Sequence, residues 1–352
     1  MAIVNEIRIG NKIICNNSAV FIVAEISANH LHKFENAARL IKEAAKAGVD
    51  AIKLQTYTAD TITIDCDNDY FKINQGTLWD DRNFYDLYKE AYTPWEWQPK
   101  LKKIAEEEGL ICFSSPFDKT AVDFLENINV PAYKVASFEI TDIPLIEYIA
   151  SKGKPMILAT GIATLSDIDE AVNACRRVGN NEIAVLKCTS AYPAPFEDMN
   201  LKTIPNLAET FGVIPGLSDH TLGITAPIAA VSLGAKIVEK HFTLSRADGG
   251  PDAAFSLEPK ELKSMVNAIR ETEKMLGEIS YDLTDKMKNS REFSRSLFIV
   301  KDIKKGEMFT EKNLRSIRPG FGMHTKYYRN VLGKVAKSDI QKGTPMSWSL
   351  LD

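Results

Sequence analysis

The sequence predicts an α/β protein made of a parallel (β/α)8 TIM barrel and a small C-terminal β-rich domain. Eight short apolar, β-branched segments alternate with segments of helical periodicity up to residue 282. Eight strands are the number that closes a parallel barrel. The 352 residues exceed the roughly 250 of such a barrel, which leaves room for one appendage. An open doubly wound sheet is the alternative, but no GxGxxG motif follows the first strand.

The expected strands are short, and the clearest helical periods fall between them. We expect strands at residues 20–25, 51–56, 111–116, 132–137, 156–160, 184–190, 212–219 and 235–242. Helical periodicity is clear at 34–47, 164–178 and 260–277. Segment 57–98 breaks this rhythm because it is rich in Asp, Asn, Tyr and Trp and too long for an ordinary βα connection. Since it follows the second strand, we expect it on the catalytic face, where it would shape substrate specificity.

Past residue 282 the alternation stops and a different pattern begins. Segment 301–307 (KDIKKGE) is echoed by segment 338–344 (SDIQKGT), and each is typical of a strand, a Lys-Gly turn and a second strand. We therefore expect three parts: a barrel at 1–282, a linker at 283–295 and a small β-rich domain at 296–352.

Composition predicts a soluble cytoplasmic protein. A formal net charge of −4 gives no electrostatic case for nucleic acid or for an anionic membrane. The five cysteines form no CxxC pair or zinc spacing, which fits reduced thiols. The first residues lack the basic and apolar regions of a signal peptide, and no apolar run approaches membrane length.

Two of the five histidines predict a metal site. His220 ends the run GLSDH and His241 ends IVEKH, so both lie at expected strand ends, where imidazoles can hold a metal over a barrel mouth. A single histidine in such a run is more often a satisfied core residue, so the pair needs support from the rest of the chain. Two histidines without a sulfur ligand, with carboxylates nearby, suit Mn²⁺, Mg²⁺, Co²⁺ or Zn²⁺. Glu239 shares strand parity with His241 and would lie beside the ion or beside its ligands.

Polar side chains stand at the ends of all eight expected strands. Any one of them is commonly a satisfied hydrogen bond, but burying Lys53 and Lys134 without anionic partners would be costly. The expected partner is a small anion that carries a phosphate and a carboxylate. Lys134 and Ser137 differ by an odd number, so the strand must end or bend between them. The candidates are Glu25, Lys53, Gln55, Ser115, Lys134, Ser137, Glu139, Thr160, Ser190, Tyr192 and Ser218.

A series of motifs in order resembles one family, the nonulosonic acid (sialic acid) synthases. The motifs are Glu25 with Asn29-His30, then KLQT (53–56), FSSPF (113–117), YKVAS (133–137), CTSAYP (188–193), GLSDHTLG (216–223), VEKHF (238–242) and GPD (250–252). The segment with Arg318-Pro319-Gly320 resembles the family's antifreeze-like (SAF) domain. Within the family, QTYT (55–58), GTLWD (76–80), YDLYKEAYTPWEW (85–97), SSP (114–116) and ASFE (136–139) resemble the pseudaminic acid synthase branch. The resemblance covers nearly the whole chain.

The resemblance implies a condensation of phosphoenolpyruvate with an open-chain 2-acetamido sugar and water, which yields a nine-carbon 2-keto acid and phosphate by C–O cleavage. For the pseudaminic branch the sugar is 2,4-diacetamido-2,4,6-trideoxy-L-altrose. By similarity His220 and His241 bind the metal, which also takes the sugar aldehyde oxygen, and Glu25 is the leading general acid/base. Glu139 is a further catalytic candidate, and Thr160 a substrate-binding one. Phosphoenolpyruvate is held by Lys53, Ser115, Lys134, Ser137, Ser190 and Ser218, and the sugar or water is contacted by Gln55, Glu139, Tyr192 and Asp252.

The resemblance also implies a domain-swapped homodimer. Arg318 corresponds to the family arginine that reaches from the SAF domain of one chain into the barrel of its partner, so it is a catalytic candidate supplied in trans. Without the resemblance, a solvated turn charge would be the default interpretation.

Three alternatives stay open. The same reaction on another sugar would give N-acetylneuraminate or legionaminate. A metal-dependent pyruvate aldolase would release no phosphate. A non-catalytic sugar-binding protein with a degenerate barrel is opposed by the intact pairs Lys53/Lys134 and His220/His241.

Overall fold

The computed structural model describes residues 6–74 and 76–352, which form two compact units, Met1–Gly277 and Glu278–Asp352. The expectation about the first residues falls mainly on 1–5, which lie outside the described residues. In the described part of the chain, no helix has both the length and the apolar character needed to cross a bilayer. The division at 277 lies close to the expected barrel end, while the exact limits 1–282, 283–295 and 296–352 stay a prediction.

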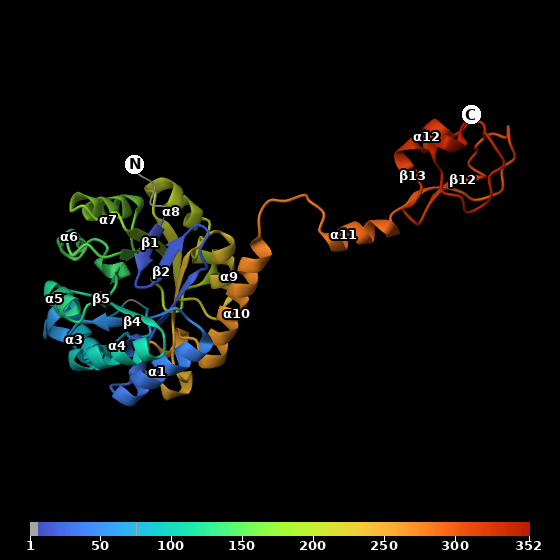
Figure 1. Ribbon diagram of the computed structural model, residues 1–352. Coiled ribbons are helices and arrows are strands. Elements are labelled where there is room, and N and C mark those ends of the chain that lie inside the picture. Colours follow the sequence, from blue (N-terminus) through green and yellow to red (C-terminus); the bar gives the residue numbers. More distant parts are fainter. Residues whose placement is uncertain (1–5, 75) are drawn as a thin grey trace. The chain divides into compact units, whose positions relative to one another are not determined.

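Unit 1 is the predicted closed barrel of eight parallel strands (Figure 1). The strands follow one another around the barrel in chain order, and β10 closes on β3 through the pairs Ile237–Phe21 to His241–Glu25. Their bounds are β3 Phe21–Glu25, β4 Ala51–Thr56, β5 Ile111–Pro116, β6 Tyr133–Val135, β7 Met156–Ala159, β8 Ile183–Cys188, β9 Ile214–Asp219 and β10 Ile237–His241. All eight expected strands are confirmed, and β6 ends at Val135, so the chain turns between Lys134 and Ser137 as parity required.

Amphipathic helices cover the outside of the barrel. In α1 the buried residues Ala37, Leu40, Ile41 and Ala44 recur at helical spacing and join one core with α10 side chains such as Met265. The helix ends at Gly48, whose φ of 90° suits a residue without a Cβ. The helix bounds are α1 Phe34–Ala47, α4 Gln98–Glu107, α5 Lys119–Asn127, α6 Ile143–Ala150, α7 Leu165–Arg177, α8 Thr203–Phe211, α9 Thr225–Ser232 and α10 Pro259–Leu276.

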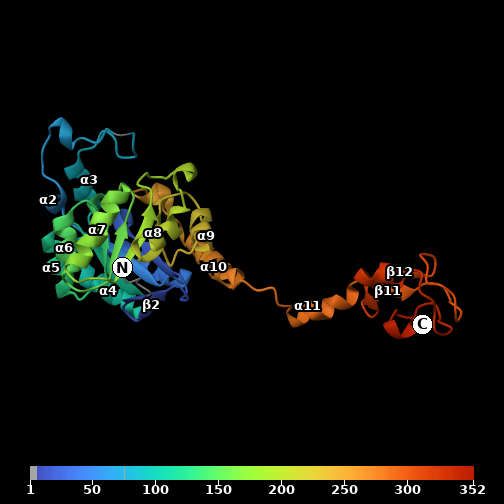
Figure 2. The ribbon, with the colours of Figure 1, turned by 90° about the horizontal axis from the view of Figure 1, so that it is seen from above.

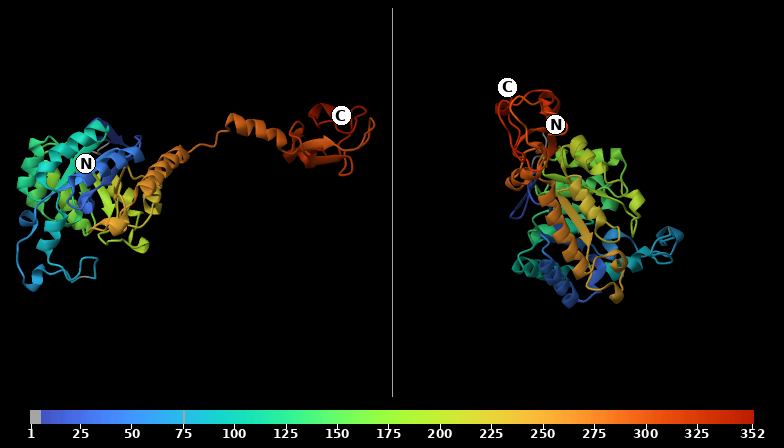
Figure 3. Two further views of the ribbon diagram at one scale, coloured as in Figure 1. Left: turned by 90° about the horizontal axis from the view of Figure 1, so that it is seen from below. Right: turned by 90° about the vertical axis from the view of Figure 1, so that its right-hand side faces the viewer.

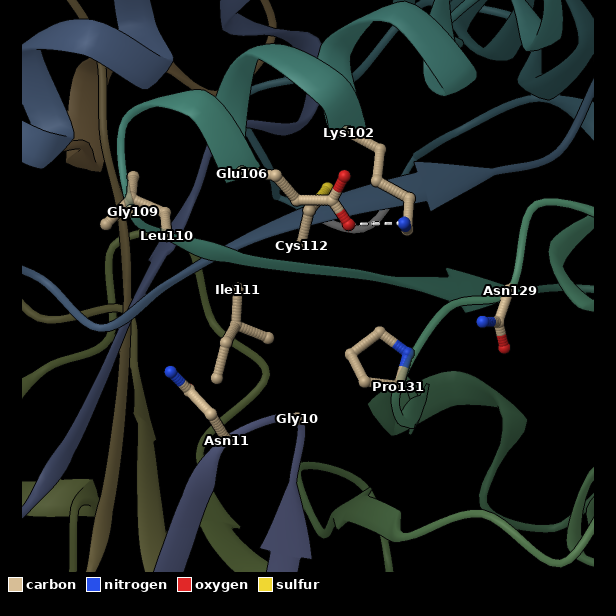
Figure 4. Close-up of a pocket in the computed structure, with 10 residues that line it drawn as sticks. All are labelled: Gly10, Asn11, Lys102, Glu106, Gly109, Leu110, Ile111, Cys112, Asn129 and Pro131. Carbon is tan, nitrogen blue, oxygen red and sulfur yellow. Dashed lines mark hydrogen bonds and ion pairs between the residues drawn. The ribbon is translucent and has the colours of Figure 1, made fainter.

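A hairpin that the sequence did not predict closes the N-terminal end of the barrel. Strands β1 (Glu6–Ile9) and β2 (Lys12–Cys15) pair antiparallel, and Ile7, Ile9 and Ile14 are buried in one cluster with the first residues of the barrel strands. Beside it, Gly10 and Asn11 line a pocket together with residues of α4 and the start of β5 (Figure 4). None of the predicted site residues lines this pocket, so the candidate site lies at the other end, where the strands finish.

The 57–98 segment forms a separate excursion that contains α2 (Ala59–Ile62) and α3 (Phe84–Ala91). Figure 2 shows it extending beyond the ring of helices. Ring contacts tie its base to the barrel: Tyr57 packs against Tyr88 at 5.6 Å and Phe117 at 5.1 Å between ring centroids. The excursion is therefore anchored by aromatic packing.

Unit 2 is a small β-rich domain, drawn in orange and red in Figures 1 and 3. Its sheet has the order β12 (Leu314–Ile317), β11 (Ser296–Ile299), β13 (Met323–His324), with α11 (Asp285–Ser290) before it and α12 (Tyr328–Val331) after it. The two echoed segments pair with each other through Ile303 and Ile340, and Gly306 and Gly343 have φ values of 81° and 90° in their turns. The predicted Lys-Gly turns are thus confirmed.

Candidate active site

A buried network of two lysines and two glutamates lies at the centre of the barrel mouth. Lys53 Nζ is 2.5 Å from Glu25 Oε2 and 3.0 Å from Glu239 Oε1, and Lys134 Nζ is 3.2 Å from the same Glu239 oxygen. The hydroxyl of Ser218 also donates to Glu239 Oε1, at 3.1 Å. All five side chains are buried. The expectation that the lysines need an anion from outside was therefore incomplete, since the barrel supplies two carboxylates.

Burial and charge act against each other in this network. Burial raises the pKa of Glu25 to about 6, although Lys53 opposes the shift. Burial would also raise the pKa of Glu239, but Lys134 and Lys53 together outweigh it and hold that pKa well below its usual range. The pKa of Lys134 is lowered, because burial and the neighbouring Lys53 exceed the effect of Glu239. Glu239 is therefore an anion held between the two lysines, and its charge also acts on His241, so its expected place beside the metal ligands stays a prediction.

Hydroxyl groups converge beside the lysines where β6, β7 and β8 end. Ser137 Oγ accepts a hydrogen bond from the Gly161 amide at 3.2 Å and donates to Cys188 Sγ at 3.3 Å. A Cβ on Gly161 would stand 2.6 Å from Ser137 Oγ and closer still to Ser190 Oγ, so only glycine lets both hydroxyls approach. The result is a small polar cradle made of Ser137, Gly161 and Ser190.

Several buried polar atoms around this cradle have no hydrogen-bond partner among the described residues. They include the hydroxyl oxygens of Ser115 and Ser190 and one carboxylate oxygen each of Glu139 and Glu239. Leaving a buried hydroxyl unpaired costs roughly 1–3 kcal/mol. Such groups are typical of a site whose ligand completes the hydrogen bonding. Lysines together with free hydroxyls suit a phosphate or a carboxylate.

The predicted histidine pair is confirmed as a pair in space. The rings of His220 and His241 lie 5.3 Å apart, and both are buried. His220 Nδ1 donates to the Thr189 carbonyl at 3.0 Å, while His241 Nδ1 faces Ser27 Oγ at 3.4 Å and Asp252 Oδ2 at 3.7 Å. Because Nδ1 of each ring is engaged, Nε2 of each is left to act as a ligand.

The two imidazoles fit a metal ion that takes its other ligands from water or substrate. Burial, and then His220, lower the pKa of His241 well below its usual value, which keeps this ring neutral as a ligand must be. Within 6–74 and 76–352, no group of three or more His, Cys, Asp or Glu residues could hold a metal ion. Such an ion would therefore have His220 and His241 as its protein donors.

Four other predicted site residues lie outside the lysine network and the histidine pair. Thr160 uses its hydroxyl within the barrel, because Oγ1 donates to the Leu186 carbonyl and accepts from the Cys188 amide, both at 3.2 Å. Gln55 pairs with Ser115 across β4 and β5. Glu139 lies in the turn after β6, and burial raises its pKa to about 7. Arg318 follows β12 in unit 2 and is exposed.

Tyr192 belongs to an aromatic wall that the sequence did not predict. Its ring lies 4.4 Å from His220 and 5.2 Å from Phe255, and Phe255 lies 5.0 Å from His241. Trp79 from the 57–98 excursion contacts Tyr192 at 5.3 Å. Ser27, which follows the first barrel strand, is hydrogen-bonded to Asp252. Phe255 lies in no strand, so no periodic signal marks it.

Comparison with known proteins gives family models that match both units. The model of the NeuB family matches residues 40–281, and the model of the SAF domain matches residues 294–352. The pseudaminic acid synthase of Campylobacter jejuni is 49% identical over 92% of this chain and 94% of its own length. That of Helicobacter pylori is 46% identical over 93% and 96%. The crystal structure of the N-acetylneuraminic acid synthetase from Leptospira borgpetersenii, 33% identical, superposes with a TM-score of 0.72 over 82% of this chain and 95% of the other.

Proposed function

The chain belongs to the NeuB family, and from this premise we propose that it condenses phosphoenolpyruvate with 2,4-diacetamido-2,4,6-trideoxy-L-altrose and water to give pseudaminic acid and phosphate. It is a phosphoenolpyruvate-dependent transferase that forms a C–C bond. Relatives with the name pseudaminic acid synthase, at 49% and 46% identity, support the sugar over the alternatives.

The observation that carries the proposal is that buried lysines and buried hydroxyls with unused hydrogen-bonding capacity occur together at the ends of the barrel strands. Lys53 and Lys134 supply positive charge, the buried Ser115 hydroxyl has no partner among the described residues, and the Ser190 hydroxyl faces that of Tyr192. Phosphoenolpyruvate carries a phosphate and a carboxylate, so it satisfies both. Two further hydroxyls lie at the strand ends: Ser137 is hydrogen-bonded to the Gly161 amide, and Ser218 to Glu239.

The chemistry follows from this placement. C3 of phosphoenolpyruvate attacks the sugar aldehyde carbon, and the C–C bond forms as the C=O π bond of the aldehyde breaks. The aldehyde oxygen takes up a proton and becomes a hydroxyl, while positive charge develops at C2. The carboxylates of Glu25 and Glu239 stabilise that charge in a site shielded from water. Water then adds at C2 and the C2–O bond to phosphate breaks. We assign to Glu25, whose pKa is about 6, the acceptance of the proton from this water.

His220 and His241 are the residues that would hold a divalent metal, Mn²⁺ first and Mg²⁺ or Co²⁺ as alternatives. Such an ion supplies Lewis-acid polarisation of a carbonyl oxygen. Tyr192 and Phe255 exclude water from one side of the pair by direct ring contact. Asp252 and Ser27 orient His241.

We also propose that the protein works in the cytoplasm as a domain-swapped homodimer, in which Arg318 of a second copy completes each site. Exposed apolar side chains on the loops after β6, β7, β8 and β9 support this, because a partner would cover them: Phe138, Ile162, Phe196 and Leu222. The test mixes Arg318→Ala with an inactive His220→Ala variant. Recovery of activity in the mixture supports the trans arrangement, and no recovery contradicts it.

Phosphate release across a sugar panel tests the function, with and without chelator. We expect release with 2,4-diacetamido-2,4,6-trideoxy-L-altrose and its loss on chelation. Better turnover of N-acetylmannosamine or of a legionaminate precursor would favour the alternative of another sugar. Product formation from pyruvate without phosphate release would indicate an aldolase.

A further inference from the structure

One tryptophan of the 57–98 excursion reaches the barrel mouth. The Trp79 indole nitrogen donates to the Pro251 carbonyl at 3.1 Å, next to Asp252. The turn that presents it is held by the Asp80 carboxylate, which accepts from the amides of Gly76 and Thr77, each at 2.8 Å. Trp79 is therefore held in a defined place relative to the strand ends.

Trp79 extends the aromatic wall away from the histidine pair. His220 contacts Tyr192 at 4.4 Å, and Tyr192 contacts Trp79 at 5.3 Å with the rings tilted by 54°. Trp79 and Tyr192 are only half-buried, whereas Phe255 behind them is buried. The wall thus offers two accessible ring surfaces that lead outward from the histidines.

We propose that Trp79 is a specificity-determining residue, whose ring contacts the apolar groups of a 6-deoxy, N-acetylated sugar. The inference rests on the proposed function, which places the aldehyde at the histidine pair. The remaining carbons of an open-chain sugar must then extend from that end, and Tyr192 and Trp79 line the side described above. Aromatic surfaces suit methyl and acetamido groups better than hydroxyls, because they bury apolar area without offering hydrogen bonds.

The test compares kcat/KM for the diacetamido-trideoxy sugar with that for N-acetylmannosamine in three variants. Losing contact with a methyl group costs roughly 10- to 200-fold in discrimination. We expect Trp79→Ala to lose that much preference through KM for the sugar, while KM for phosphoenolpyruvate stays unchanged. Trp79→Phe keeps a ring but removes the hydrogen bond to Pro251, and should keep most of the preference.

Trp95→Ala is the matched control. Trp95 also belongs to the excursion and donates to a backbone carbonyl, that of Tyr57 at 3.1 Å, but its ring packs on Phe124 rather than on Tyr192. We expect its sugar preference to equal that of the unmodified enzyme. The same loss in Trp95→Ala, or in Trp79→Phe, would overturn the inference, because loop anchoring would then explain it. An unchanged preference in Trp79→Ala would overturn it too.

A binding measurement separates this inference from the proposed function. Calorimetric titration of each sugar alone needs no turnover. Trp79→Ala should weaken binding of the diacetamido-trideoxy sugar more than that of N-acetylmannosamine, which has one acetamido group and no 6-methyl group. If the unmodified enzyme releases no phosphate with any sugar, the proposed function fails. If it does release phosphate and Trp79→Ala binds both sugars as before, only the inference fails.

Discussion

Replacing Glu239 by glutamine should destabilise the barrel strongly. The amide keeps the size of the side chain but removes the negative charge that faces Lys53 at 3.0 Å and Lys134 at 3.2 Å. Lys53 still has Glu25 at 2.5 Å, whereas among the described residues Lys134 has no other carboxylate within ion-pair distance. Removing one partner of a buried pair costs about 3–5 kcal/mol. That is a large part of the roughly 5–15 kcal/mol that holds a domain folded.

The matched control is Glu90→Gln. Glu90 pairs with Arg82 at 2.6 Å, but the two side chains are 53% and 32% exposed, so the loss should not exceed about 1 kcal/mol. Urea denaturation followed by tryptophan fluorescence measures both free energies of unfolding. A difference between the two variants below about 1 kcal/mol would refute the reasoning, because Lys134 would then not depend on Glu239.

The dependence on pH and on ligand sharpens this test. In Glu239→Gln the pKa of Lys134, already lowered by burial, falls further, so the folded state favours the neutral amine. A base with a depressed folded pKa gains stability as pH rises, and the deficit should therefore shrink toward alkaline pH. Phosphoenolpyruvate should stabilise the variant more than the unmodified protein, because its charge replaces the lost carboxylate.

Four further predictions concern individual groups of the site. Ser190→Ala should raise KM for phosphoenolpyruvate by roughly 10- to 100-fold, since a hydrogen bond to a charged group is worth about 1.5–3 kcal/mol. The free energy of unfolding should fall by no more than about 1.5 kcal/mol, because the hydroxyl faces only that of Tyr192 among the described residues. Thr160→Val should lower the free energy of unfolding by about 1–3 kcal/mol in a urea titration, because it leaves the Cys188 amide unpaired. The pH profile of kcat/KM should show an inflection near 7 from Glu139, which disappears in Glu139→Gln and moves to lower pH in Asp142→Asn, because Asp142 raises the pKa of Glu139. A raised carboxyl pKa also means that the stability contributed by Glu139 is complete below the unfolded pKa of 4.5 and declines as pH rises toward 7. A pH profile of kcat/KM without an inflection near 7 would contradict the assignment. His220→Ala should abolish metal-dependent phosphate release while circular dichroism shows an intact barrel, and activity that survives in chelator would contradict the metal role.

Local pattern was sufficient for the barrel and for most of the candidate site. Strands buried on both faces are continuous apolar runs, so each of the eight could be located in the sequence. Ligands gather where such strands end, which identified His220, His241 and the lysines before their neighbours were known. The β1–β2 hairpin was not predicted, because two strands of four residues show too few alternations of apolar and polar residues to be distinguished from a loop.

Only the tertiary structure decided which groups are hydrogen-bond or ion-pair partners. From its strand parity with His241, the sequence placed Glu239 beside the metal or its ligands, but only closure of the barrel shows that Lys53 and Lys134 contact it. Thr160 and Ser190 look alike as strand-end hydroxyls, yet Thr160 hydrogen-bonds to the barrel backbone, whereas Ser190 faces the hydroxyl of Tyr192. Periodicity determines the face on which a side chain lies, whereas its partners come from strands far away in the chain and depend on how those strands close.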